Sequence, residues 1–241
     1  MKKLIIGFLI GVALTVPVMM GIMQPGIPSE ELVPTPEIVY VTPTPMPTPT
    51  PQVIYKERLT DLEQVIENVK GACVMVYAHM PDGSTMQSSG WIYNKRIVTV
   101  KHGVVGAERI DVFLDGSSTG AKGYIHYMDD ELDLAVLEFD RIADSVTLGD
   151  SGKLKDGEKV IGIVSPQGSQ NMIDECIYSG TDFADGEYIL NISESIIDPG
   201  ASGGAIFNYD SELVGMVFKG GNTTGVAIPI NEIKPILENL N

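Results

Sequence analysis

A serine lies among small residues in the segment Asp198-Pro-Gly-Ala-Ser-Gly-Gly-Ala205, between two apolar runs. The small neighbours of Ser202 would let a carbonyl group approach its hydroxyl. The backbone N–H groups of Gly200 and Ser202 could then converge on the carbonyl oxygen and stabilise the charge that develops on it. Because a serine hydroxyl is a weak nucleophile until a base takes its proton, this chemistry needs a histidine close by in the fold.

The chain order of the candidate residues restricts the class of site. The histidines, which all precede Ser202, are His79, His102 and His126. Residues 200–204 also fit the G-x-S-x-G turn of α/β-hydrolases, but in those enzymes the histidine follows the serine. The subtilisin order would need Asp61 or Asp82 in a parallel α/β framework, which the β-rich pattern described below does not support.

The order His, Asp, Ser remains, and it selects His102 and Asp133 as partners of Ser202. His102 follows the apolar run at 97–100, and Asp133 leads directly into the apolar run at 134–137. An aspartate in that place can accept the imidazole Nδ1–H, fix the tautomer and stabilise the imidazolium. A more ordinary interpretation makes Asp133 one solvated residue of the acidic run 129–133, which lacks the spacing of an EF-hand. We expect no metal site and no cofactor.

Short strands must position these residues. Glycine-rich composition with few aromatic residues favours a turn-rich β protein. Helices are predicted over 57–70 and over the C-terminal segment that carries Ile233, Ile236, Leu237 and Leu240 on one face. Ten apolar or alternating runs separated by turn residues predict strands: 72–78, 90–93, 97–100, 110–114, 134–139, 159–164, 188–193, 204–207, 213–218 and 226–228.

Taken together, the motifs resemble the trypsin-like (chymotrypsin-fold) serine proteases, and most closely the protease domain of the HtrA/Deg branch. The resemblance implies an all-β fold of two six-stranded antiparallel barrels, at about 71–150 and 151–230, with a short N-terminal helix and a C-terminal helix. The segments that carry it are Ser88-Ser-Gly-Trp-Ile-Tyr93, Ile97-Val-Thr-Val-Lys-His-Gly103, Asp133-Leu-Ala-Val-Leu137, Ile197-Asp-Pro-Gly-Ala-Ser-Gly-Gly-Ala-Ile-Phe-Asn208 and Gly225-Val-Ala-Ile-Pro229.

The same resemblance implies a serine endopeptidase that works through an acyl-enzyme, with His102, Asp133 and Ser202 as the catalytic triad. Gly200 and Ser202 would form the oxyanion hole. Ile197 would line the pocket for the substrate side chain before the cleaved bond, and we expect small or medium apolar side chains there. The residues implied to pair with the substrate backbone are Phe218, Lys219 and Gly220.

Two residues near the candidate triad differ from those usual in the family. Ala201 stands where digestive proteases carry an aspartate that pairs with a newly cut N-terminus, so we expect no activation of that kind. Gly103 replaces the usual valine or alanine, which would loosen the local strand.

Members of the HtrA branch usually carry a PDZ domain after the protease domain, and we expect none within residues 1–241. They commonly form trimers, so a homo-oligomer is one expectation.

The N-terminal part of the chain indicates where the domain works. Two lysines precede an uncharged apolar run at 4–23, which predicts a signal anchor over residues 1–24 and an extracytoplasmic domain, at the periplasm or cell surface. A cleaved signal peptide, and hence a secreted protein, is the alternative. Residues 25–56, with their X-Pro repeats, predict an extended linker. The protease domain would occupy residues 57–241.

Charge excludes one class of partner and suggests a substrate preference. The chain carries 32 acidic and 16 basic residues, a net charge of −16, which argues against nucleic acid. All of this net charge lies within residues 57–241, with 29 acidic and 13 basic side chains. We therefore expect a preference for neutral or basic substrate segments, weakening with salt.

Two functional alternatives and one covalent question stay open at this point. The fold could serve as a catalytically silent binding or scaffold module on the cell surface, with the triad present in the sequence but not assembled. A stalked adhesin would need no triad at all. Cys73 and Cys176 could form a disulfide in an oxidising compartment or remain two buried thiols.

Overall fold

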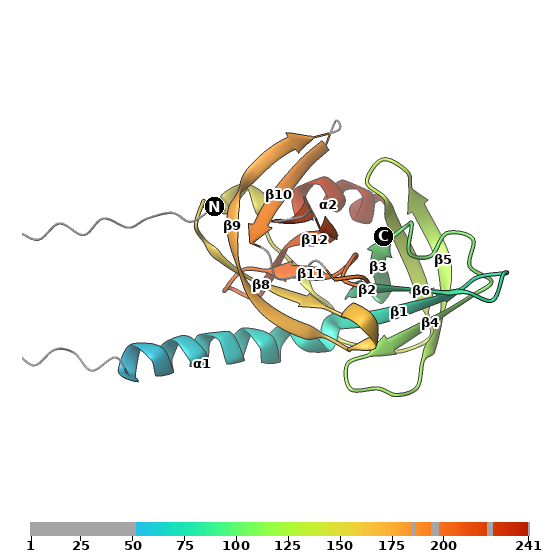
Figure 1. Cartoon of the computed structure of the whole chain (residues 1–241), viewed down its shortest axis with the longest axis horizontal. Coiled ribbons are helices and arrows are strands. Elements are labelled where there is room, and N and C mark those ends of the chain that lie inside the picture. The colour runs from blue at the N-terminus through green and yellow to red at the C-terminus, as the bar shows by residue number, and fades with distance from the viewer. Residues whose placement is uncertain (1–51, 185–186, 194–197, 221–223, 241) are drawn as a thin grey trace, which may run out of the picture. The chain divides into compact units, whose positions relative to one another are not determined.

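Residues 52–184, 187–193, 198–220 and 224–240 are described by the computed structural model (Figure 1). The predicted anchor and most of the predicted linker lie outside the described residues, as does Ile197. None of the helices in the described part of the chain is both long and apolar enough to cross a membrane.

The first barrel is closed and contains six antiparallel strands in the order β1-β2-β3-β6-β5-β4. Consecutive strands pair within β1-β2-β3 and within β4-β5-β6. Pairing of β3 with β6 and of β1 with β4 joins these two sets. They are drawn mainly in green in Figure 1. The bounds are β1 Cys73–His79, β2 Thr85–Tyr93, β3 Arg96–Val100, β4 Arg109–Leu114, β5 Ala121–Asp129 and β6 Leu134–Phe139.

The second barrel contains six antiparallel strands in the order β11-β8-β9-β10-β13-β12, and pairing of β11 with β12 closes it. A further short strand, β7 (Thr147–Leu148), adds in parallel to β12. The expectation of two six-stranded antiparallel barrels is therefore confirmed. The bounds are β8 Lys159–Val164, β9 Met172–Ala184, β10 Glu187–Ser193, β11 Ala205–Phe207, β12 Glu212–Gly220 and β13 Thr224–Pro229.

The prediction missed three strands, for reasons visible in their side chains. Most side chains of β5 are exposed or half-exposed, so no apolar run announces this strand. The long β9 contains acidic residues and Gly180, which break its pattern. The short β7 has two residues. Helix α1 (Gln52–Val69) begins five residues before the predicted start, directly after the last proline of the linker.

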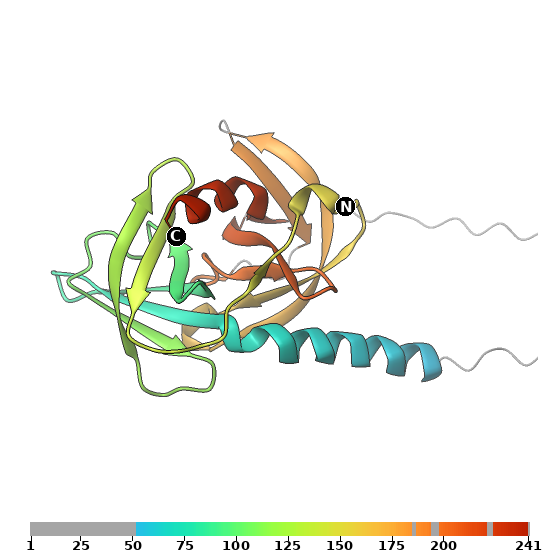
Figure 2. The same cartoon turned by 180° about the vertical axis from the view of Figure 1, so that it is seen from behind.

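Three apolar clusters form the core, two inside the barrels and one between them. The cluster between the barrels joins both helices to both sheets, and Figure 2 shows the C-terminal helix α2 (Ile230–Asn239) lying between the two sets of strands. Residues Ile233 and Leu237 of α2 are buried there, as their i, i+4 spacing requires. The other contributors include Val65 of α1, Trp91 of β2, Phe207 of β11 and Met216 of β12.

The two cysteines lie in different clusters, as two buried thiols. Cys73 packs between the barrels, and Cys176 packs inside the second barrel. Burial raises the pKa of the Cys73 thiol well above its usual range, and the Asp115 carboxylate raises that pKa further while Lys70 opposes it. The structure thus corresponds to the second of the two alternatives for these residues.

Candidate active site

The pairing of β3 with β6 brings His102 and Asp133 together. Val100, the last residue of β3, lies opposite Leu134, the first residue of β6. The Lys101 N–H donates to the Asp133 carbonyl at 2.7 Å, which extends the ladder by one bond. His102 follows that bond directly, so an antiparallel register places it beside an aspartate 31 residues away in the chain.

Both oxygens of the Asp133 carboxylate contact His102. Oδ1 accepts the His102 backbone N–H at 2.8 Å, and Oδ2 accepts the ring Nδ1–H. Because a carboxylate can only accept, this contact assigns the ring proton to Nδ1 and leaves Nε2 as an acceptor. The Asp133 side chain is 20% exposed and the His102 side chain 49%, so the aspartate is the more enclosed partner.

Ser202 lies in the loop between β10 and β11, which is tied to both barrels. The Gly203 N–H donates to the Val217 carbonyl at 2.6 Å, and the Val217 N–H returns a bond to Gly204 at 2.8 Å. The Ser89 N–H of β2 donates to the Ser202 carbonyl at 2.8 Å. These bonds fix the backbone of a half-buried serine against a strand of the first barrel.

Two consecutive residues of β2 link the Ser202 loop to the His102 loop. Ser89 holds Ser202, and Ser88 packs against Gly103, where a β-carbon would lie 3.0 Å from the Ser88 side chain. Among the described residues there is no hydrogen bond between the Ser202 hydroxyl and His102. Such contacts are commonly long in substrate-free sites and tighten when substrate binds.

Gly103 lies in a turn beyond the end of β3, so it does not loosen that strand as expected. Its lack of a side chain instead lets the turn that carries His102 pack closely on β2.

The turn before Ser202 has the geometry needed for converging N–H donors. The Ala201 N–H donates to the Asp198 carbonyl at 3.0 Å, which makes Pro199 and Gly200 the central residues of a β-turn. Gly200 has φ +98°, typical of the third residue of a type II turn, where glycine is favoured. Within the described part of the chain, neither the Gly200 N–H nor the Ser202 N–H meets an acceptor.

The residues predicted to bind the substrate are only partly placed. Phe218, Lys219 and Gly220 belong to β12, where the pairing with β13 shifts register between Val217 and Lys219. Ile197 lies outside the described residues. Their roles stay predictions. The other two histidines, His79 and His126, contact Asp111 and Glu138 respectively.

Sequence reasoning missed the residues that support the turn at 198–202. Buried Ser89 reaches the turn from β2, and the loop at 165–171 reaches it from the end of β8. Half-buried Gln87 of β2 holds that loop through the Ser165 carbonyl. The available signal was a run of three polar residues, Gln87, Ser88 and Ser89, shortly before the apolar end of the strand. Among the described residues, no three or more His, Cys, Asp or Glu side chains are grouped so that they could hold a metal ion.

Comparison with known proteins gives consistent matches. Residues 88–216 match the family model of the trypsin-like peptidase domain. The chain is 35% identical over 182 residues to the serine protease Do-like HtrA of Bacillus subtilis (strain 168), covering 66% of this chain and 40% of that protein. It is 34% identical over 175 residues to a probable periplasmic serine endoprotease DegP-like of Hahella chejuensis (strain KCTC 2396), covering 66% and 36%. The chain thus spans less than half the length of these relatives.

Solved structures show the same fold at lower identity. The active form of the Rv3671c protease of M. tuberculosis superposes with a TM-score of 0.66 and 16% identity, covering 73% of this chain and 83% of that one. The HtrA-type protease AlgW with a tripeptide superposes with a TM-score of 0.67 and 23% identity, covering 74% and 62%.

Proposed function

Because the chain belongs to the trypsin-like peptidase domain family, we propose that it is a serine endopeptidase that hydrolyses peptide bonds of protein substrates outside the cytoplasm. Ser202 attacks the substrate carbonyl while His102 takes the hydroxyl proton at Nε2. His102 then protonates the leaving amine, and water hydrolyses the acyl-enzyme by the same route.

The observation that carries this proposal is the double contact between Asp133 and His102. A carboxylate that holds both the backbone N–H and the ring Nδ1–H of a histidine orients the ring and selects its tautomer. The resulting Nε2 lone pair is the group that general-base catalysis needs. The N–H groups of Gly200 and Ser202 supply the second requirement, two donors for the oxyanion.

The proposed location and substrate contacts rest on sequence features. Residues 1–24 would anchor the chain in a membrane with the protease domain on the extracytoplasmic side, and the proline-rich linker would hold the domain away from the surface. The backbone of an extended substrate would pair with β12 at Phe218, Lys219 and Gly220. The substrate side chain before the cleaved bond would contact Ile197.

A covalent probe tests the function directly. A fluorophosphonate should add its mass to the folded chain, and peptide mapping should place the adduct on Ser202. Heat-denatured protein is the control and should stay unlabelled, because an unassembled serine hydroxyl is not activated. Folded protein that stays unlabelled and leaves casein intact would contradict the proposal and favour the catalytically silent binding module.

The acidic domain should also select among substrates by charge. With 29 acidic and 13 basic residues in the protease domain, a peptide flanked by lysines should be cleaved faster than the same peptide flanked by glutamates at low salt. The ratio of the two kcat/KM values should shrink when the ionic strength rises from about 0.01 M to about 0.5 M, because the Debye length shortens. Equal rates at low salt would contradict this prediction.

A further inference from the structure

We infer that Ser89 is a positioning residue for the oxyanion hole, and that it acts together with the loop at residues 165–171, here called the bridging loop. In this arrangement the two hold the Pro199–Gly200 peptide with its N–H directed to the substrate before any substrate binds. The inference rests on the proposed function, because the N–H in question is a proposed oxyanion donor.

The Ser89 hydroxyl joins the two segments with two hydrogen bonds. It donates to the Gly200 carbonyl at 2.7 Å and accepts the Ser165 N–H at 2.7 Å. The Ser89 backbone meanwhile donates to Ser202 and accepts from the Thr99 hydroxyl at 2.6 Å. Ser89 is 1% exposed and Ser165 is fully buried, so water cannot readily replace the hydroxyl if it is removed.

The bridging loop fixes the direction of the Gly200 N–H. The Gln167 N–H donates to the Pro199 carbonyl at 3.0 Å. Because a trans peptide is planar, the carbonyl of Pro199 and the N–H of Gly200 point in opposite directions. Tying the carbonyl to Gln167 therefore turns the Gly200 N–H away from the bridging loop. A type I turn at the same place would reverse this peptide and break the bond to Gln167.

The bridging loop is itself held rigidly at both ends. At one end, the Gln87 side chain donates to the Ser165 carbonyl and accepts the Gly168 N–H at 2.8 Å. Gln87 and Ser89 lie on the same face of β2, since alternate residues of a strand share a face.

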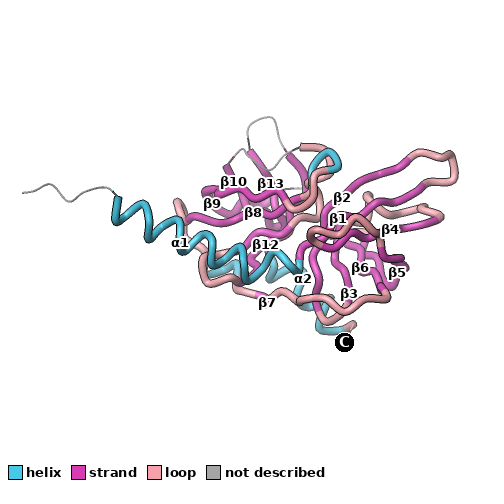
Figure 3. Tube along the Cα trace, turned by 90° about the horizontal axis from the view of Figure 1, so that it is seen from below, coloured by secondary structure: helices cyan, strands magenta, loops and turns pink. Residues whose placement is uncertain are grey.

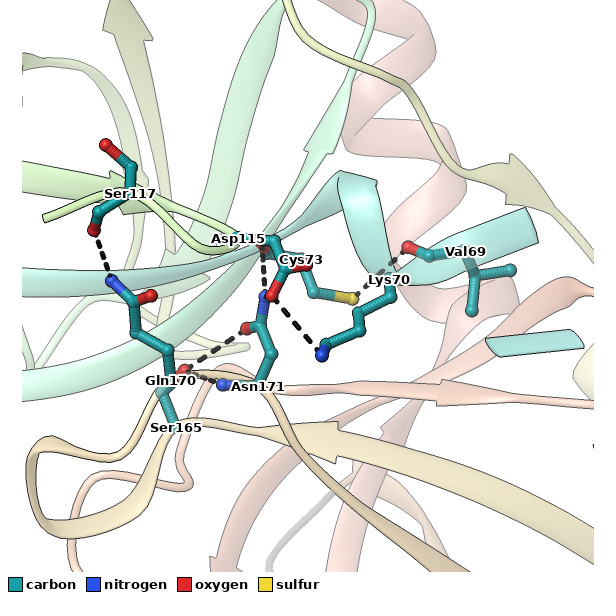
Figure 4. A network of polar contacts seen from close by, with 8 residues as sticks. All are labelled: Val69, Lys70, Cys73, Asp115, Ser117, Ser165, Gln170 and Asn171. Carbon is teal, nitrogen blue, oxygen red and sulfur yellow. Dashed lines mark hydrogen bonds and ion pairs between the residues drawn. The ribbon is translucent and has the colours of Figure 1, made fainter. Parts of the chain in front are cut away.

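At the other end of the bridging loop, Asn171 donates to the Cys73 carbonyl at 3.1 Å and to Asp115 Oδ1 at 3.0 Å (Figure 4). The first barrel thus supports, through a loop of the second barrel, the turn that precedes the nucleophile.

Ser165 and Gln87 also fill the space around Gly200. A β-carbon at this position would lie 3.0 Å from the Ser165 carbonyl oxygen and 3.1 Å from the Gln87 side-chain amide. The turn therefore packs directly on the bridging loop and on Gln87. Gln167 adopts φ +48°, a conformation uncommon for residues other than glycine, of a kind often found at functional sites.

Replacement of Ser89 by alanine tests the inference by kinetics. Ser89→Ala should lower kcat at least about tenfold, and by no more than the about 10²- to 10³-fold that loss of a whole oxyanion donor causes. KM should change less than about twofold, because the oxyanion exists only in the transition state. The measurement uses the full chain and a fluorogenic peptide taken from a casein site that the wild type cleaves.

Ser151→Ala is the matched control. Ser151 is also buried, and its hydroxyl also accepts a backbone N–H, that of Asn231 at 3.3 Å. This contact holds the start of α2 and not the turn at 198–202. Its replacement should leave kcat unchanged. A kcat for Ser89→Ala within twofold of the wild-type value, at equal folded fraction, would overturn the inference.

Hydrogen exchange decides the inference even if the chain proves inactive. Exchange of the Gln167 amide in the whole chain, resolved by fragmentation mass spectrometry, should accelerate at least about tenfold in Ser89→Ala, because the Pro199 carbonyl then leaves it. The Val217 amide should keep its protection. Unchanged exchange at Gln167 would overturn the inference, whereas an inactive wild type with accelerated exchange in the variant would reject only the proposed function.

Discussion

Asp133→Asn is expected to lower kcat by about 10⁴-fold while leaving the fold intact. The carboxylate accepts two N–H groups of His102, one from the backbone and one from the ring. The two donors meet different oxygens of the carboxylate, and an asparagine in the same place keeps an acceptor oxygen at only one of these two positions. If its oxygen takes the backbone N–H, its NH₂ group faces Nδ1 and stabilises the tautomer that carries the proton on Nε2. That tautomer cannot accept the Ser202 proton.

The backbone at this position tolerates the change. Asp133 has φ +48°, and asparagine occupies this left-handed region as readily as aspartate does. A loss of activity in Asp133→Asn would thus report on the tautomer and not on unfolding.

The matched control is Asp130→Asn, in the same acidic run. Asp130 pairs with Lys101 and its side chain is 85% exposed, so the change should leave kcat within about twofold of the wild type. Both variants would be compared by kcat on one peptide and by circular dichroism. Comparable activity in Asp133→Asn and the wild type would reject the assignment of Asp133 to the triad.

Gly203→Ala is expected to destabilise the protein by about 3–4 kcal/mol and to abolish cleavage. A β-carbon at this position would clash with the Ser89 carbonyl oxygen and would lie 2.8 Å from the Thr99 hydroxyl oxygen. Both atoms belong to the first barrel, and β2 cannot withdraw without releasing Ser202. Overpacking contributes about 1–3 kcal/mol, and the left-handed backbone, φ +88°, adds about 1–2 kcal/mol.

Gly83→Ala separates these two causes. Gly83 has φ +85°, but a β-carbon there would meet no atom within 4 Å. It should therefore show only the conformational penalty of about 1–2 kcal/mol and keep full activity. Urea unfolding of the wild type and both variants gives the free energies of unfolding. Equal destabilisation by the two substitutions would show that the close approach of the two barrels at Gly203 is not as tight as described.

The order of motifs along the chain predicted much of the fold. The apolar runs before His102 and after Asp133 are β3 and β6, and their antiparallel pairing is what joins the two residues. Four consecutive residues of each strand are buried, 97–100 in β3 and 134–137 in β6, so these segments are mainly apolar and easily recognised. β5 and β9 were not predicted, because sheet pairing and not an apolar pattern holds their largely exposed or polar residues in place.

The turn around Ser202 was only partly predictable. Glycine at 200 and 203 and serine at 202 indicated a tight turn with converging donors. Nothing local indicates that the Pro199 carbonyl would be taken by Gln167, or the Gly200 carbonyl by Ser89. These partners lie 32 and 111 residues away in the chain, and hydrogen bonds of that kind depend on how two barrels dock.

The residue types capable of the chemistry, their order, and the strands that lead into His102 and out of Asp133 can all be read along the chain. These properties follow from side-chain chemistry and from short-range apolar patterning. Contacts between distant segments, by contrast, provide the support of the turn at 198–202 and the close packing of Gly103 and Gly203 on β2. Figure 3 shows the strands of the two barrels as separate groups, and the contacts between them are long-range. A local pattern contains no information about such contacts, because they form only when both barrels close and dock.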